Sequence, residues 1–281
     1  MKIAVASGKG GTGKTTVSSN LALCLSKKFR TALVDCDVEE PNIHIFFNGP
    51  AESKKVFQKK PFANPELCSF CKECMNFCKF GAINIIKENI YFSYDLCHSC
   101  GGCKIICPEN AIFEEDIEIG EVSVYSPDNN LTVIEGRLLP GKPSGNDVID
   151  TAKQLSENFD IVIYDSPPGS ACPFIETVHD SDFCVLVTES TPFGLHDLKA
   201  AFEVCKKLNV PVGVIINRSL EDDSLIENFC KEECLDILMK IPNSLEIARI
   251  QNNGELFVRV MPKWETDFLN LFESIKSRGF D

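Results

Sequence analysis

The sequence has few positive charges, few histidines and no long apolar run. Its 28 Lys and Arg residues against 41 Asp and Glu give a net charge of −13, so we expect no general binding to nucleic acid. The four histidines form no cluster, and we expect each to be structural. No apolar run approaches the length of a membrane span, and the first residues do not resemble a signal peptide. We therefore expect a cytoplasmic protein without stable membrane association.

Cysteine, by contrast, is abundant, with 15 residues in a chain of 281. In a reducing cytoplasm this number favours metal or redox chemistry over disulfide bonds. The length allows one large domain or one domain that carries an insertion.

A phosphate-binding pattern occupies the start of the chain. Residues 2–6 predict an apolar strand and residues 15–27 a helix, with the segment SGKGGTGKTT between them. In the pattern G-x-x-x-x-G-K-[ST], backbone N–H groups surround phosphate oxygens, the lysine contacts the outer phosphates and the hydroxyl binds Mg²⁺. The positive end of the helix dipole favours the same anion. We predict that ATP or ADP is bound by the loop residues Gly8, Lys9, Gly10, Gly11, Thr12, Gly13, Lys14, Thr15 and Thr16.

Two later apolar strands end in carboxylates. The strand predicted over residues 31–37 ends with Asp35 and Asp37, and the strand over 160–165 ends with Asp165. Ligands of α/β sheets bind at the carboxyl ends of the strands, so we predict that Thr15 and Asp165 hold Mg²⁺ and that Asp35 and Asp37 lie beside the phosphates. The alternative for Asp35 and Asp37 is that they cap a loop.

Eight cysteines form an internal repeat. Two runs of C-x2-C-x2-C-x3-C follow one another, as in bacterial two-cluster ferredoxins, where the fourth cysteine of each run ligates the other cluster. We therefore predict two [4Fe–4S] clusters, one held by Cys68, Cys71, Cys74 and Cys107 and the other by Cys78, Cys97, Cys100 and Cys103. Zinc bound by C-x2-C pairs is the alternative, although zinc has no need of the third and fourth cysteines.

The repeat divides the chain into two predicted domains. Residues 48–65 are rich in Pro, Asn and Lys, which is typical of a linker or domain edge. We predict an α/β fold with a mostly parallel, doubly wound sheet in residues 1–55 and 119–281, interrupted by a small α+β ferredoxin domain in residues 56–118.

The segment KGGTGKT, Lys9–Thr15, resembles the deviant Walker A motif of the MinD/ParA/Mrp ATPases and the nitrogenase iron protein. The whole chain resembles MinD-superfamily ATPases that contain an inserted ferredoxin domain. The resemblance implies a homodimer that closes on ATP, in which Lys9 reaches the partner's nucleotide. It also implies that Lys14 and Asp37 take part in catalysis, with Asp37 orienting the attacking water, and that Asp35 and Asp37 also belong to the Mg²⁺ site.

The base-binding residues are predicted near the last strands. By the same resemblance, Asn217 contacts adenine, with Arg218 beside it and Pro242 along the base-binding edge. A guanine site would need a carboxylate at the spacing N-K-x-D, and the residues Arg218, Ser219 and Leu220 that follow Asn217 do not supply it. We therefore predict an adenine nucleotide.

Three functions fit these predictions. The first is ATP hydrolysis coupled to electron transfer to a redox partner protein. The second is Mrp-like assembly or delivery of metal clusters, with Cys172, Cys230 and Cys234 available for a labile site; Cys230 and Cys234 are expected on one helix face. The third is a MinD-like spatial regulator with redox-sensing clusters. An apolar stripe between residues 268 and 275 predicts a terminal helix packed on the core rather than on a membrane.

Overall fold

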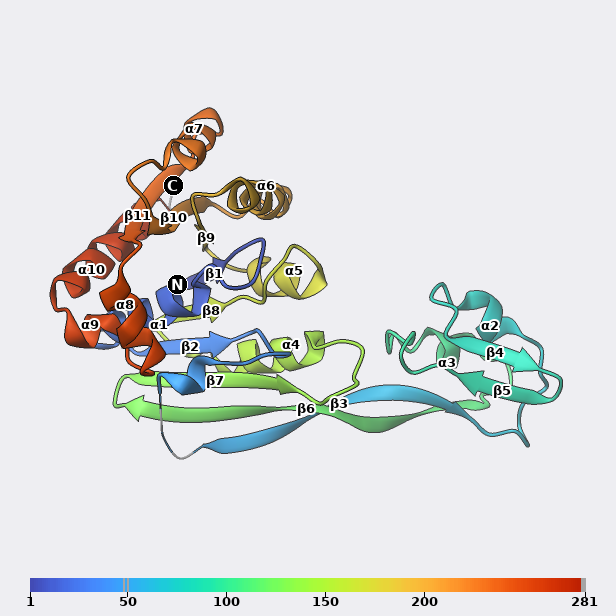
Figure 1. Cartoon of the computed structure of the whole chain (residues 1–281). Helices are drawn as coiled ribbons and strands as arrows, with labels where there is room; N and C mark the ends of the chain where they lie inside the picture. The colour runs from blue at the N-terminus through green and yellow to red at the C-terminus, as the bar shows by residue number, and fades with distance from the viewer. Residues whose placement is uncertain (48, 50, 279–281) are drawn as a thin grey trace.

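The computed structural model describes residues 1–47, 49 and 51–278 (Figure 1). A nine-stranded sheet has the order β11-β10-β9-β1-β8-β2-β7-β6-β3. The strands from β11 to β7 are parallel, whereas β6 and β3 are antiparallel additions at one edge. This confirms the predicted α/β fold with a mostly parallel sheet. The strands of the large sheet are β1 (Lys2–Ala6), β2 (Thr31–Asp35), β3 (Glu52–Ala63), β6 (Ile112–Asp128), β7 (Leu131–Leu138), β8 (Ile161–Asp165), β9 (Phe183–Thr188), β10 (Val212–Ser219) and β11 (Asp236–Pro242).

Helices cover both faces of the parallel part. One face packs on α1 (Lys14–Ser26), α8 (Leu245–Asn252), α9 (Phe257–Val260) and α10 (Lys263–Lys276). The other face packs on α4 (Asn146–Leu155), α5 (Cys172–Val178), α6 (Pro192–Lys207) and α7 (Ser224–Glu232). The central strands β1, β8 and β2 are apolar along almost their whole length because both of their faces are covered.

The C-terminal helix α10 belongs to this core. Phe268, Leu271, Phe272 and Ile275 are all buried there, which confirms the predicted packing of the apolar stripe. Among the described residues, no helix is long and apolar enough to cross a membrane.

The antiparallel strands β3 and β6 form a long ribbon. They pair from Glu52 with Val124 to Ala63 with Ile112. The inner end of β6 also pairs with β7, and the outer ends continue beyond the sheet to a small module (Figure 1). Cross-strand ion pairs link Lys55 to Glu118 at 2.7 Å and Lys59 to Asp116 at 3.1 Å along the ribbon.

Of the two interpretations of residues 48–65, a linker or a domain edge, the linker is wrong for residues 52–63. These residues are one strand, and two of its lysines, Lys55 and Lys59, pair with carboxylates across the ribbon. Residues 48 and 50 lie outside the described part of the chain.

The small module occupies residues 64–111. It contains α2 (Glu73–Phe77) and α3 (Gly102–Ile106), and an antiparallel hairpin formed by β4 (Ile83–Ile86) and β5 (Asn89–Phe92). A short 3-10 helix, η1 (Ile43–Ile45), lies in the segment after β2.

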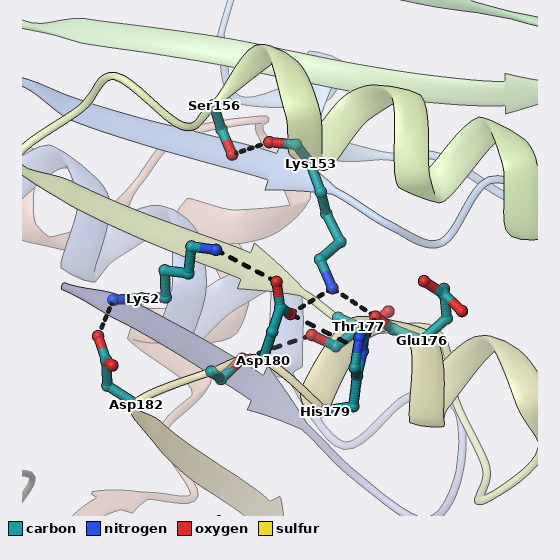
Figure 2. Close-up of polar contacts among 9 residues, drawn as sticks. Lys2, Lys153, Ser156, Glu176, Thr177, His179, Asp180 and Asp182 are labelled. Atoms are coloured by element: carbon teal, nitrogen blue, oxygen red, sulfur yellow. Dashed lines mark hydrogen bonds and ion pairs between the residues drawn. The ribbon is translucent and has the colours of Figure 1, made fainter.

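A buried lysine joins helices to the start of the first strand. Lys153 of α4 donates hydrogen bonds to Asp180 and to the Glu176 carbonyl (Figure 2). Its Nζ also lies over the Tyr164 ring, 5.1 Å from the ring centroid. Lys2 of β1 pairs with the same Asp180 at 3.2 Å. This network lies at the amino ends of the strands, opposite the phosphate loop.

Candidate functional site

The phosphate loop joins β1 to α1 at the carboxyl edge of the sheet. Gly13 precedes the helix with φ 96° and Gly11 has φ 79°, which glycine adopts without strain. A side chain at Gly8 would collide with the Asp197 carbonyl of α6. The first helical hydrogen bond runs from Val17 N to Gly13 O, so the N–H groups before it are free to bind an anion at the helix N-terminus.

Asn217 supports this loop from the end of β10. Its side chain is 8% exposed, and its Nδ2 donates to the Thr12 carbonyl at 2.7 Å. A Cβ atom at Gly13 would collide with the same amide. The observed bond therefore assigns Asn217 to holding the loop, and its contact with adenine stays a prediction.

Lys14 lies among carboxylates. Burial lowers its pKa, while Asp165, Asp37 and Asp35 act in the opposite direction. Asp165 is 1% exposed, and burial raises its pKa to about 7, although hydrogen bonding with Thr15 and the charge of Lys14 oppose this. Its Oδ1 has no hydrogen-bond partner among the described residues. A buried carboxylate oxygen without a partner beside a threonine hydroxyl is suited to a hard divalent cation.

Asp35 and Asp37 occupy different positions. Asp35 is fully buried and accepts hydrogen bonds from the backbone N–H groups of Asp37, Asn42 and Ile43. It therefore holds the segment after β2 in place. Burial raises the pKa of Asp35 well above its usual value, and the charge of Asp165 adds to the rise. Asp37, by contrast, borders the open cavity beside the loop.

That cavity has a volume of about 380 Å³. Its walls include predicted residues from the loop together with residues of the segment after β2. The lining residues are Gly10, Gly11, Gly13, Lys14, Thr15, Thr16, Asp37, Glu40, Asn42, Ile45, Phe46, Pro168 and Arg218. The predicted residues Gly8, Lys9, Thr12, Asp35, Asp165, Asn217 and Pro242 are not in the lining.

The residues missed by sequence reasoning give the cavity an apolar side. Ile45 is the last residue of η1 and Phe46 follows it, and both line the same cavity as the phosphate loop. The signal available in the sequence was the apolar run IHIFF after Asp37, which interrupts an otherwise polar segment. Arg218 lines the cavity and pairs with Glu189.

The eight repeated cysteines are gathered in the small module. Its two halves have the same backbone geometry: Lys72 and Gly101 precede α2 and α3 with φ 68° and 71°, and Phe70 and Ser99 both have φ 53°. The halves also exchange equivalent hydrogen bonds, from Asn64 N to Ala111 O at 2.9 Å and from Ser93 N to Ala82 O at 2.8 Å. The sequence repeat is thus a structural repeat with approximate twofold symmetry.

Two cavities in the module are each bordered by four cysteines. We call the first the inner cavity; its volume is about 260 Å³, and its lining includes Cys78, Cys97, Cys100 and Cys103. We call the second the outer cavity; its volume is about 10 Å³, and its lining includes Cys68, Cys71, Cys74 and Cys107. Each group contains three cysteines of one run and the fourth of the other, the same sets that the spacing predicts. Within the described residues, no three His, Cys, Asp or Glu side chains converge to hold a single metal ion.

Cys172, Cys230 and Cys234, considered above for a labile site, differ in exposure, and that site stays a prediction. Helix α7 ends at Glu232, so Cys234 lies beyond it with φ 55° and is exposed, whereas Cys230 is buried in the core. The expectation that both share one helix face is therefore wrong. Cys172 is exposed at the start of α5.

A family model described as the CobQ/CobB/MinD/ParA nucleotide binding domain matches residues 3–257. An uncharacterised protein from Methanocaldococcus jannaschii is 32% identical over 280 residues, which cover 98% of this chain and 96% of that protein. An iron–sulfur cluster carrier protein from Pseudomonas fragi is 23% identical over 270 residues, which cover 90% of this chain and 76% of the carrier.

Among solved structures, the septum site-determining protein MinD from Pyrococcus horikoshii, complexed with Mg-ADP, has the same fold. Its TM-score is 0.56 at 19% identity, with 98% of this chain and 95% of that chain covered. The sheet order, the phosphate loop and the extent of the family match lead to one conclusion: the chain belongs to the CobQ/CobB/MinD/ParA family of P-loop nucleotide-binding ATPases.

Proposed function

We propose that this protein binds and hydrolyses ATP and uses the nucleotide state to control electron transfer through two [4Fe–4S] clusters to a partner protein. The observation that carries this proposal is the continuity of the structure. The ribbon strand β6 pairs with β7 in the nucleotide-binding sheet and leads directly into the module that holds the two four-cysteine cavities.

The donor chemistry of the module fits iron–sulfur clusters. Thiolates are the protein ligands of [4Fe–4S] clusters, and each cavity is bordered by four of them. A cluster contains several irons and sulfides, so its ligands surround a space instead of meeting at one point, consistent with the lack of a single-ion site. The inner cavity is already wide, whereas the cysteines of the outer one would have to move apart. When bound, such a cluster accepts or donates one electron at a time.

On the nucleotide side, each residue of the loop has a proposed task. Lys14 neutralises the outer phosphates, and Thr15 with Asp165 holds Mg²⁺, because they provide a hydroxyl and an unpartnered carboxylate oxygen next to each other. Asp37 is open to the cavity and can accept a hydrogen bond from an attacking water. Asp35 holds the position of Asp37 by accepting a hydrogen bond from the backbone N–H of Asp37. Dimer closure through Lys9 remains part of the proposal.

The test is an anaerobic redox titration of the purified protein followed by EPR, with no nucleotide, with ADP and with a non-hydrolysable ATP analogue. We expect nucleotide to shift at least one midpoint potential by about 60 mV, which corresponds to a tenfold change in a one-electron equilibrium. Iron and sulfide analysis of the same sample should give two clusters per chain.

The matched control is Lys14→Ala, which removes the phosphate-binding charge far from the module. This variant should keep its iron, lose ATP turnover and give the same titration curve with and without nucleotide. A wild-type protein with both clusters and superimposable curves would contradict nucleotide control of the potentials. A protein without iron after anaerobic preparation would overturn the cluster assignment itself.

A second candidate is delivery of clusters to other proteins. The observation that favours it is the similarity to an iron–sulfur cluster carrier protein. Transfer of iron and sulfide to an apo-ferredoxin, accelerated by ATP, would support this candidate. Retention of both clusters during ATP turnover would favour electron transfer.

A further inference from the structure

One face of strand β3 connects the nucleotide-binding domain to the second cysteine run. Alternate residues of a strand point to the same side, and here Val56, Gln58 and Lys60 form a series. Val56 is buried in the core against α4, and Gln58 donates to Asp147 in the first turn of α4 at 2.5 Å. Lys60, the outermost of the three, reaches the module.

Lys60 is a buried lysine, only 2% exposed. Its Nζ donates to the Cys97 carbonyl at 2.7 Å and to the Tyr94 carbonyl at 3.2 Å. Cys97 is the first cysteine of the second run and lines the inner cavity. The ammonium group of Lys60 is therefore held by a hydrogen bond to the backbone of Cys97, one of the four cysteines that line the inner cavity.

Within the described part of the chain, no buried lysine lines the outer cavity. Among the described residues, the buried lysines are Lys14, Lys60 and Lys153, and the other two lie in the nucleotide-binding domain. Lys72 borders the outer cavity but is exposed to solvent and has Glu73 beside it. The two halves of the module share their backbone geometry, so Lys60 is a clear electrostatic difference between them.

Other charges near the inner cavity are weaker or compensated. Glu114 lines the cavity and pairs with Lys104 at 3.0 Å. Lys79 lines it as well, but it is exposed. Asp95, which lines a groove together with Cys97, is also exposed, so water screens it more than it screens the buried ammonium.

We propose that Lys60 raises the reduction potential of the cluster in the inner cavity above that of the cluster in the outer cavity. This inference rests on the proposed function, since it requires both clusters. Reduction adds one electron, and therefore negative charge, beside the fixed ammonium, which stabilises the reduced form. No bond to Lys60 forms or breaks.

The consequence is a direction for the electron within the module. One electron from an external low-potential donor comes to rest in the inner cavity, whichever cavity it enters first. The inner cavity is on the side of the module that faces the nucleotide-binding domain. Residues of the module, Asp95, Cys97 and His98, line one groove together with residues at the start of α4 and in the loop before it, namely Pro143, Ser144, Asn146 and Asp147. Lys60 thus places the reducing equivalent next to the part of the chain that binds nucleotide.

The experiment compares three lysine variants by EPR-monitored redox titration with dithionite as the electron donor. Lys60→Met removes the charge and keeps much of the chain length, Lys60→Arg keeps the charge, and Lys59→Met is the matched control. Lys59 is adjacent on β3 but exposed and paired with Asp116. Cys100→Ser, which changes one inner ligand, identifies the EPR signal of the inner cluster.

We expect Lys60→Met to weaken reduction of the inner cluster at least tenfold, a fall of about 59 mV for one electron. The outer couple should stay unchanged, Lys59→Met should match the wild type, and Lys60→Arg should retain most of the higher potential. An unchanged inner couple, or a shift in the outer couple alone, with full iron content would overturn this inference and leave the proposed function standing. Absence of iron from the wild type would overturn both.

Discussion

Asn217 ties the end of β10 to the phosphate loop through a single hydrogen bond. The Thr12 carbonyl that accepts it is buried under the loop, and leaving such an acceptor without a partner costs about 1–3 kcal/mol. The position of Gly13 depends on the same amide, because no side chain would fit between them.

Asn217→Ala should therefore weaken the binding of phosphates as a whole. We expect about a tenfold loss of affinity for ATP and a similar loss for inorganic tripolyphosphate, measured by isothermal titration calorimetry. A direct adenine contact predicts a different result, in which ATP binding weakens and tripolyphosphate binding does not. Asn243→Ala, in an exposed position after β11, provides the control.

Lys9 has a different relation to the nucleotide. It is half-buried, its carbonyl accepts a hydrogen bond from Ser7 at 2.6 Å, and it does not line the cavity of its own chain. This position is compatible with the proposal that Lys9 reaches the nucleotide of a second subunit while Lys14 binds that of its own chain.

At the scale of elements, the network around Lys153 joins α4, the end of α5 and β1 (Figure 2). Burial alone would raise the pKa of Asp180, but its hydrogen bonds and ion pairs with Lys153 and Lys2 outweigh this and hold the pKa below the usual value. A carboxylate with a depressed folded-state pKa stabilises the fold above its unfolded pKa and stops doing so as the pH falls through the folded pKa.

Asp180→Asn should lower the free energy of unfolding by about 1–3 kcal/mol at pH 7, because the buried Lys153 loses its counter-ion. Urea denaturation at several pH values measures this. The difference from the wild type should narrow as the pH falls below about 4, where Asp180 of the unfolded chain becomes protonated, and should be lost below the lower folded-state pKa. Asp116→Asn removes an exposed pair and should have a much smaller effect; an equal loss in both variants would contradict the role of burial.

The ribbon formed by β3 and β6 connects the small module to the large sheet. Its ion pairs and its antiparallel pairing, which has one register shift between Val56 and Phe57, hold the module away from the parallel sheet while keeping it attached through two strands (Figure 1). A movement of β6 relative to β7 would therefore be transmitted to the cysteine-bearing segments without passing through a flexible linker.

At the scale of the whole molecule, ATP should control association. Two chains of net charge −13 repel each other, so a closed dimer with bound nucleotide needs cations at the interface. Multi-angle light scattering with Mg²⁺ and a non-hydrolysable ATP analogue should show twice the monomer mass for the wild type.

Lys9→Ala should bind the same analogue but stay monomeric under these conditions. Lys28→Ala, at the far end of α1, should dimerise normally. Dimerisation of Lys9→Ala at wild-type concentrations would show that Lys9 does not bridge the subunits.

Local sequence determined the parts of this protein whose residues are close together in the chain. The glycines of the phosphate loop and the apolar strands that end in Asp35 and Asp165 each predicted an element correctly, because backbone conformation and strand periodicity are local properties. The spacing of the eight cysteines predicted the two groups of four that border the cavities, and the clusters themselves stay a prediction. The approximate symmetry of the module follows from the repeat in the same way.

Tertiary structure decided what each side chain contacts. The lysines near residue 55 suggested a linker, yet they belong to a strand, because their partners are carboxylates some sixty residues later on β6. Asn217 donates a hydrogen bond to the Thr12 carbonyl, and Lys60 donates one to the Cys97 carbonyl. Asp35 accepts hydrogen bonds from the backbone of the segment after β2. Such contacts join residues distant in sequence, and only packing of the whole chain determines whether a polar side chain is buried and which partner satisfies it.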